Sequence, residues 1–157
     1  MDTADKVKSP LLSCLIKICV CVFGSLLLVA TTLFWIYGTD TTHASRNSIW
    51  WNARARNLIP PSAKKITIQQ DFLDHYATYT VSEKSLADFL NTSFDVTDSY
   101  SERRPVDPSE IGKPIGRLGW VVTKDTVEYS YSARNGGMHH YFHDASSGQT
   151  YQESAYW

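Results

Sequence analysis

One uninterrupted apolar run stands out near the N-terminus of this 157-residue chain. Residues 18–37 (ICVCVFGSLLLVATTLFWIY) contain no charged side chain. At 1.5 Å per residue, a helix of this length spans about 30 Å, the thickness of the hydrocarbon core of a bilayer. Trp35 and Tyr37 close the run, where amphipathic rings settle at the headgroup level. The pattern predicts a transmembrane helix over residues 18–37, with Lys17 at the membrane interface.

A cleaved signal peptide is the alternative interpretation of this run. Its apolar region would be about 7–15 residues long and followed by a small-x-small site, and the run fits neither requirement. Three lysines precede the run, namely Lys6, Lys8 and Lys17, whereas the first basic residue after it is Arg46. The positive-inside rule therefore predicts that residues 1–17 lie in the cytoplasm and the larger part of the chain outside. Arg54 and Arg56 count against this orientation, because they are basic residues that lie only a short distance after the apolar run.

Small and polar residues form a stripe along the predicted helix. With Leu28 as a larger apolar member, the stripe recurs at spacings of three and four: Ser13, Lys17, Cys21, Gly24, Ser25, Leu28 and Thr32. Small residues let a second helix approach closely, so the stripe from Cys21 to Thr32 indicates a packing face, although a lone anchor can carry such a stripe by chance. All three cysteines lie in or beside this run. We therefore expect no disulfide and no thiolate metal site in the rest of the chain.

Residues 38–62 form a juxtamembrane segment between the apolar run and the folded part. Residues 44–58 have helical composition, with Ser45 as a candidate N-cap. Trp50 and Trp51 stand beside basic residues, which suits a helix lying on the membrane surface. The alternative is that both tryptophans pack onto the folded domain.

The folded domain is expected over residues 63–157, and from residue 65 onward the pattern changes to period two, which is typical of half-buried strands. Residues 66–71 and 75–81 alternate in this way and predict a hairpin. A helix then starts after Ser82, its N-cap, with Val81 placed to contact Leu86. Leu86, Phe89 and Leu90 give that helix one apolar face, which predicts packing on a sheet.

The C-terminal part predicts a four-stranded antiparallel meander. Its strands are expected over residues 118–123, 127–134, 138–143 and 149–156, and the Asn-Gly pair at 135–136 is a strong hairpin signal. The sequence thus predicts an α+β domain over residues 63–157, with an antiparallel sheet and one packed helix.

Residues 95–117 separate the predicted helix from the meander and are rich in proline and glycine. A loop of this length is often functional or mobile, although a solvated crossover is the simpler interpretation. Tyr100, Arg103 and Arg104 make it our first candidate for binding a partner. Tyr156 and Trp157 at the end of the chain are further candidates, because tyrosine and tryptophan are enriched where protein surfaces meet; most aromatic residues of the meander are expected to stabilise the sheet.

A histidine cluster is the most distinctive chemical feature. On a strand, His139 and His143 share one face while His140 faces away, and the two lie about 13 Å apart, too far to bind one ion directly. Convergence with His75 on a neighbouring strand would allow a metal site, and outward-facing histidines could instead sense pH. The simpler interpretation is that these are ordinary residues of an aromatic sheet.

Other chemistry is excluded by what the sequence lacks. It contains no nucleophile elbow, phosphate-binding loop or dinucleotide fingerprint, and no cysteine nucleophile lies beyond the apolar run. From residue 38 onward the chain has 12 basic and 14 acidic residues, which gives no basic surface for nucleic acid. Asn91 begins a glycosylation sequon that matters only in a secretory pathway.

These patterns predict a single-pass protein of the cell membrane with a small extracytoplasmic α+β domain. We expect that domain to bind another protein or serve as an accessory subunit, without a cofactor or catalysis of its own. The alternative is a membrane-tethered domain that binds a metal or small ligand around His139 and His143, enzymatic or not. A third hypothesis is a ligand pocket beneath Leu86 and Phe89.

Overall fold

The computed structural model describes residues 10–38, 40–71, 74–93, 100–132 and 136–155. The chain divides into two units, Met1–Ile36 and Tyr37–Trp157. Helix α1 (Pro10–Gly38) contains the stretch Leu12–Phe34, which is long and apolar enough to cross a membrane, with a mean hydropathy of 2.5. The helix begins earlier than predicted, because proline suits the first helical position and no breaker follows it. Lys17 therefore lies within the helix.

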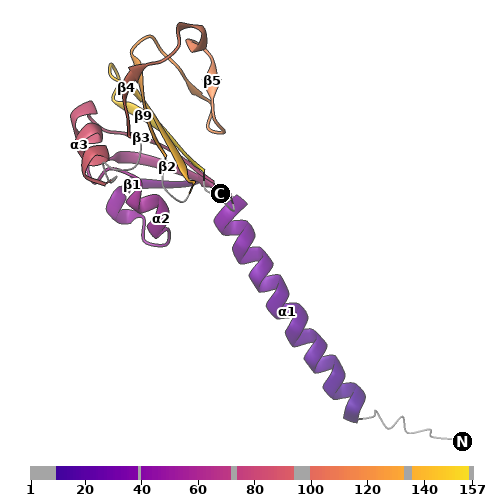
Figure 1. Cartoon of the computed structure of the whole chain (residues 1–157). Helices are drawn as coiled ribbons and strands as arrows, with labels where there is room; N and C mark the ends of the chain where they lie inside the picture. Colours follow the sequence, from indigo (N-terminus) through magenta and orange to yellow (C-terminus); the bar gives the residue numbers. More distant parts are fainter. Residues whose placement is uncertain (1–9, 39, 72–73, 94–99, 133–135, 156–157) are drawn as a thin grey trace, which may run out of the picture. The chain divides into compact units, whose positions relative to one another are not determined.

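The second unit is built on one antiparallel sheet of seven strands (Figure 1). The strands are β1 (Thr41–Ser45), β2 (Lys64–Gln70), β3 (His75–Thr80), β4 (Tyr100–Pro105), β7 (Thr126–Ser132), β8 (Met138–Asp144) and β9 (Gln149–Ala155). Their order across the sheet is β1-β2-β3-β9-β8-β7-β4. With helices α2 (Ala53–Asn57) and α3 (Glu83–Ser93), the fold is α+β, as the sequence pattern predicts.

The predicted local elements are present in the middle and the C-terminal part of the domain. β2 and β3 form the expected hairpin, and β7, β8 and β9 form consecutive antiparallel pairs. α3 follows Ser82, whose side-chain oxygen accepts a hydrogen bond from the backbone N–H of Ser85 at 3.3 Å. Leu86, Phe89 and Leu90 are buried, as the apolar face of this helix predicts.

The fourth strand of the meander was predicted wrongly. Within residues 118–123, the short strand β6 (Trp120–Val121) pairs with β5 (Pro114–Ile115) in a separate two-stranded sheet. The position beside β7 belongs to β4, which lies within the segment expected to be a loop. β4 has the sequence YSERRP, with no apolar alternation. β4 is held in the sheet by its pairing with β7, which is distant in the sequence. A local sequence pattern does not reveal such a pairing.

The sheet also extends further toward the N-terminus than the expected domain boundary at residue 63. β1 pairs with β2, and a 3₁₀ turn (Arg46–Ser48) and the short helix α2 follow in place of one helix over residues 44–58. Ile49, Ala55 and Ile59 are fully buried in the core, and this burial outweighs the local helix propensity. Trp51 is half-buried, whereas Trp50 is 80% exposed, so the two tryptophans differ.

The two faces of the sheet are covered differently. Residues opposite each other on neighbouring strands share a face, so the pairing register separates an inner from an outer face. The inner face packs beneath α2 and α3 and holds the main core, which includes Ile66, Ile68, Tyr141 and Leu86. The outer face holds a second cluster of Tyr76, Trp120, Val122 and Tyr151. Figure 1 shows α2 and α3 on one side of the sheet and β5 on the other.

Candidate functional site

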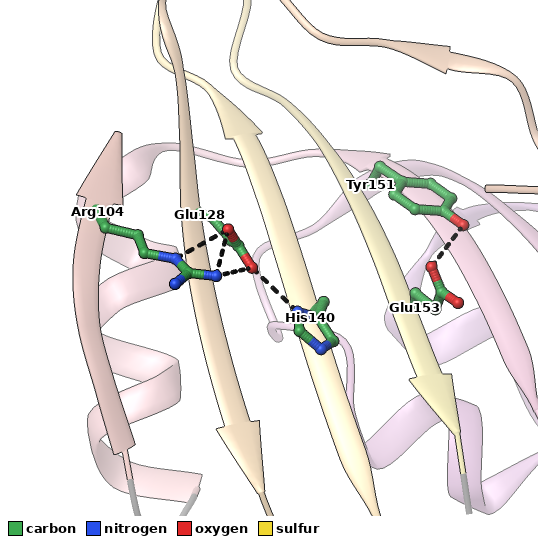
Figure 2. A network of polar contacts seen from close by, with 5 residues as sticks. All are labelled: Arg104, Glu128, His140, Tyr151 and Glu153. Carbon is green, nitrogen blue, oxygen red and sulfur yellow. Dashed lines mark hydrogen bonds and ion pairs between the residues drawn. The ribbon is translucent and has the colours of Figure 1, made fainter. Parts of the chain in front are cut away.

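A network of charged groups crosses the outer face at β4, β7 and β8 (Figure 2). Glu128 on β7 accepts two hydrogen bonds from the guanidinium of Arg104 on β4, at 3.0 Å from Nε and 2.9 Å from Nη2. His140 on β8 places Nδ1 3.1 Å from Glu128 Oε1 and stacks on Phe142 with ring centroids 6.3 Å apart. Two donors from different strands therefore fix one carboxylate.

The surroundings of Glu128 keep it ionised. Its pKa is lowered to about 2, because the hydrogen bond with His140 and the bond and charge of Arg104 outweigh the opposing effect of burial. A carboxylate with so low a pKa is a weak proton acceptor near neutral pH. The network thus fastens edge strand β4 to the sheet and presents a fixed array of charge and aromatic surface.

A segment that we call the arm, residues 106–123, lies over β3 and β9 on the same outer face. Trp120 stacks on Tyr151 with ring centroids 6.4 Å apart. The guanidinium of Arg117 lies 5.2 Å from the ring centroid of Tyr76 and forms an ion pair with Asp71 at 2.7 Å. Aromatic packing and charge therefore fix the arm to the sheet at two strands.

Gly116 makes the closest approach between the arm and the sheet. Its φ is +62°, and a Cβ atom there would lie 1.5 Å from the hydroxyl oxygen of Tyr151. Only glycine fits both the left-handed conformation and the space.

Two apolar side chains of the arm are exposed. Ile111 is 45% exposed and Val121 is 50% exposed, although both belong to a segment whose neighbours Trp120 and Val122 are buried. Beside Val121 lies an open hollow of about 560 Å³ between the arm and the turn that joins β8 to β9. Asp144 lines this hollow, and hydrogen bonds from Thr123, Ser146 and Ser147 hold the pKa of its carboxyl well below the usual range despite opposing burial.

The predicted histidine candidates all lie on the inner face. His75 on β3 and His139 on β8 lie opposite Ser154 of β9 in the strand register, one on each side of it, so the fold brings the three residues into one row. His75 is 1% exposed and His139 is 3% exposed. Burial lowers the pKa of His75 to about 3 and that of His139 to about 4. His143 lies further along β8, where Nδ1 is 2.9 Å from the hydroxyl of Thr150.

These histidines do not form a larger ligand group. Among the residues that the structure describes, no three His, Cys, Asp or Glu side chains are grouped closely enough to hold a metal ion. As the strand pattern predicts, His140 faces away from His139 and His143, and it joins the outer network instead.

The predicted interaction residues differ in the contacts that they make. Arg103 donates to Glu83 at 2.5 Å and Arg104 pairs with Glu128, so both hold β4 within the chain. Tyr100 begins β4 opposite Tyr131. Tyr156 and Trp157 lie outside the described residues.

Along α1, the hydroxyls of Ser25 and Thr32 donate hydrogen bonds to the backbone carbonyls of Cys21 and Leu28. These bonds satisfy polar groups of the predicted packing stripe within the helix itself.

Sequence reasoning did not single out Glu128, Ile111 or Val121. Alternation along residues 127–134 places Glu128 on the polar side of its strand, but its pairing with Arg104 depends on the unexpected position of β4. No protein-family model, no curated protein and no solved structure matches this chain.

Proposed function

We propose that this chain is a single-pass membrane protein whose α+β domain lies outside the cytoplasm and binds another protein. The outer surface of the arm, from Ile111 to Val121, is the binding element. The domain acts as an anchored binding module or accessory subunit and performs no catalysis of its own.

The membrane assignment is supported by α1. Its stretch Leu12–Phe34 is long and apolar enough to span a bilayer, and the side chains along it are exposed. Lys6 and Lys8 precede it, which favours a cytoplasmic N-terminus under the positive-inside rule. Arg46, the first basic residue after the helix, lies beyond a short neutral or acidic stretch.

The single observation that carries the binding assignment is the arm. Trp120 and Arg117 fix it to a rigid sheet, yet Ile111 and Val121 remain exposed on it, and Val121 lines an open hollow. Binding residues are often carried on connecting segments that a rigid scaffold positions. Exposed apolar side chains next to a hollow offer a protein partner both burial and shape.

Site-specific photocrosslinking in native membranes tests this proposal. A photoreactive phenylalanine is introduced at position 111 or 121, and at Asn91 on α3 as a matched exposed control. We expect one crosslinked product of the same mass from positions 111 and 121 and none from position 91. The variant Val121→Asp should abolish the product from position 111, because a charge at the contact opposes burial of the surface.

Two outcomes contradict the binding assignment. Equal products from positions 91, 111 and 121 indicate random collision instead of a defined surface. A product from position 111 that survives Val121→Asp places the contact away from the arm's exposed apolar side. Extraction of the full chain by alkaline carbonate contradicts the membrane anchor separately.

A further inference from the structure

We propose that the corner formed by Trp50 and Arg54 rests in the headgroup layer of the bilayer, so that the folded domain contacts the lipid surface directly. This inference rests on the proposed membrane anchor. It assigns a lipid contact to a side chain that neither the core nor the arm uses.

The corner is a rigid part of the domain. Ile49 is fully buried immediately before Trp50, and the side chain of Asn52 accepts a hydrogen bond from the N–H of Ala55 at 2.9 Å. The amide of Asn52 also donates to the side chain of Gln70 at the end of β2. Between these fixed points Trp50 remains 80% exposed, more than any other large apolar side chain described in the domain.

The corner lies at the end of the sheet to which the membrane helix is connected. Gln70 pairs with His75, and Thr41 pairs with Ile68, so Thr41, Gln70 and the bound Asn52 belong to the same end. Only residues 39 and 40 separate the end of α1 from the start of β1. A link of three peptide steps reaches at most about 11 Å.

The chemistry of the corner suits lipid headgroups. Tryptophan is enriched at membrane interfaces, because its ring is apolar while its N–H can reach water or a phosphate oxygen. Arg54, four residues after Trp50 in the sequence, is exposed on α2, and a guanidinium pairs well with phosphate. Residues 41–70 contain five basic side chains and no acidic one. An exposed tryptophan also suits a protein partner. A protein partner, however, does not require the tryptophan to lie at the end of the sheet that is connected to the membrane helix, whereas a lipid contact does.

Spin-label accessibility in liposomes tests the contact with the full chain. Cys14, Cys19 and Cys21 are replaced by alanine, and a nitroxide is attached after Ala53→Cys, three residues beyond Trp50, or after Ala145→Cys as the control. Ala145 is exposed in the β8–β9 turn, at the opposite end of the sheet. The liposomes contain phosphatidylcholine and phosphatidylglycerol only, so no protein partner is present.

We expect the label at position 53 to be less accessible to a water-soluble nickel chelate and more accessible to oxygen than the label at position 145. Adding Trp50→Ser should return position 53 to the values of position 145, while circular dichroism shows an unchanged sheet, since Trp50 does not contribute to the core.

Three results overturn the inference. Equal accessibility at both positions, in a chain that resists carbonate extraction, removes the lipid contact and leaves the anchor intact. Protection at position 53 that is unaffected by Trp50→Ser removes the role of Trp50. Protection that occurs in native membranes but not in pure lipid assigns the corner to a protein partner. A chain that carbonate extracts from liposomes loses the anchor as well.

Discussion

Acidification between pH 7 and pH 5 should destabilise the domain through two buried histidines. His75 and His139 lie on the inner face, and burial lowers their pKa values to about 3 and about 4. In the unfolded chain each has a pKa near 6.5. The unfolded state therefore binds protons first as the pH falls, and the free energy of unfolding decreases from about pH 6.5 downward.

The size of the effect follows from the pH interval. At pH 5.0 both histidines are still neutral in the folded state. In the unfolded state each is protonated, because pH 5.0 is about 1.5 units below its pKa there. At about 1.4 kcal/mol per unit, each contributes a loss of about 2 kcal/mol, or about 4 kcal/mol together. Glu128 does not offset this loss, because its folded-state pKa of about 2 is below its unfolded value and its contribution is lost only below about pH 4.5.

Urea unfolding of the full chain in detergent micelles, followed by near-ultraviolet circular dichroism, measures this change. His75→Gln should reduce the loss between pH 7 and pH 5 by about 2 kcal/mol, because one of the buried histidines whose pKa rises on unfolding is absent. A variant such as Leu86→Ala should lower stability at both pH values and leave the difference unchanged. If His75→Gln loses as much stability on acidification as the unmodified chain, the burial argument is refuted.

Three further changes test the packing and the outer network by the same unfolding assay. Gly116→Ala should cost about 2–5 kcal/mol, because a left-handed residue gains a Cβ and the new atom meets Tyr151, whereas Gly119→Ala, with open space around it, should cost only about 1–2 kcal/mol; equal losses would contradict the close approach. Leu86→Ala should cost about 2–5 kcal/mol at neutral pH, and a loss below 1 kcal/mol would place this helix face outside the core. Glu128→Gln should reduce the loss of stability between pH 4.5 and pH 2, and an unchanged acid limb would contradict the lowered pKa.

Elements with strong local signals could be predicted from the sequence. The period-two pattern of β2, β3, β7, β8 and β9 reflects alternation between two faces that are both partly covered, and the pairings confirm it. Helix α3 was found from its cap at Ser82 and its apolar spacing. The opposite orientations of His139 and His140 followed from strand geometry alone.

Both edge strands were missed for a physical reason. β1 (TTHAS) and β4 (YSERRP) are polar and lie at the two edges of the sheet, where one side of the strand has no neighbour in the sheet and apolar alternation is not required. Their positions depend on long-range contacts, such as the ion pair of Arg104 with Glu128, that no local window contains. The candidate site was predicted in part, because residues 95–117, named as the first candidate for binding a partner, include Arg104 and much of the arm. The pairing of Arg104 with Glu128 was missed, since it depends on the position of β4.

Native mass spectrometry of the chain after gentle extraction from its own membranes shows directly whether the anchored domain binds another protein. We expect a particle heavier than the 17.8 kDa chain by the mass of a different protein, and Val121→Asp should return it to 17.8 kDa, whereas Asn91→Asp should not. A native particle of 17.8 kDa, or of whole multiples of that mass, would contradict the claim that the anchored domain binds another protein.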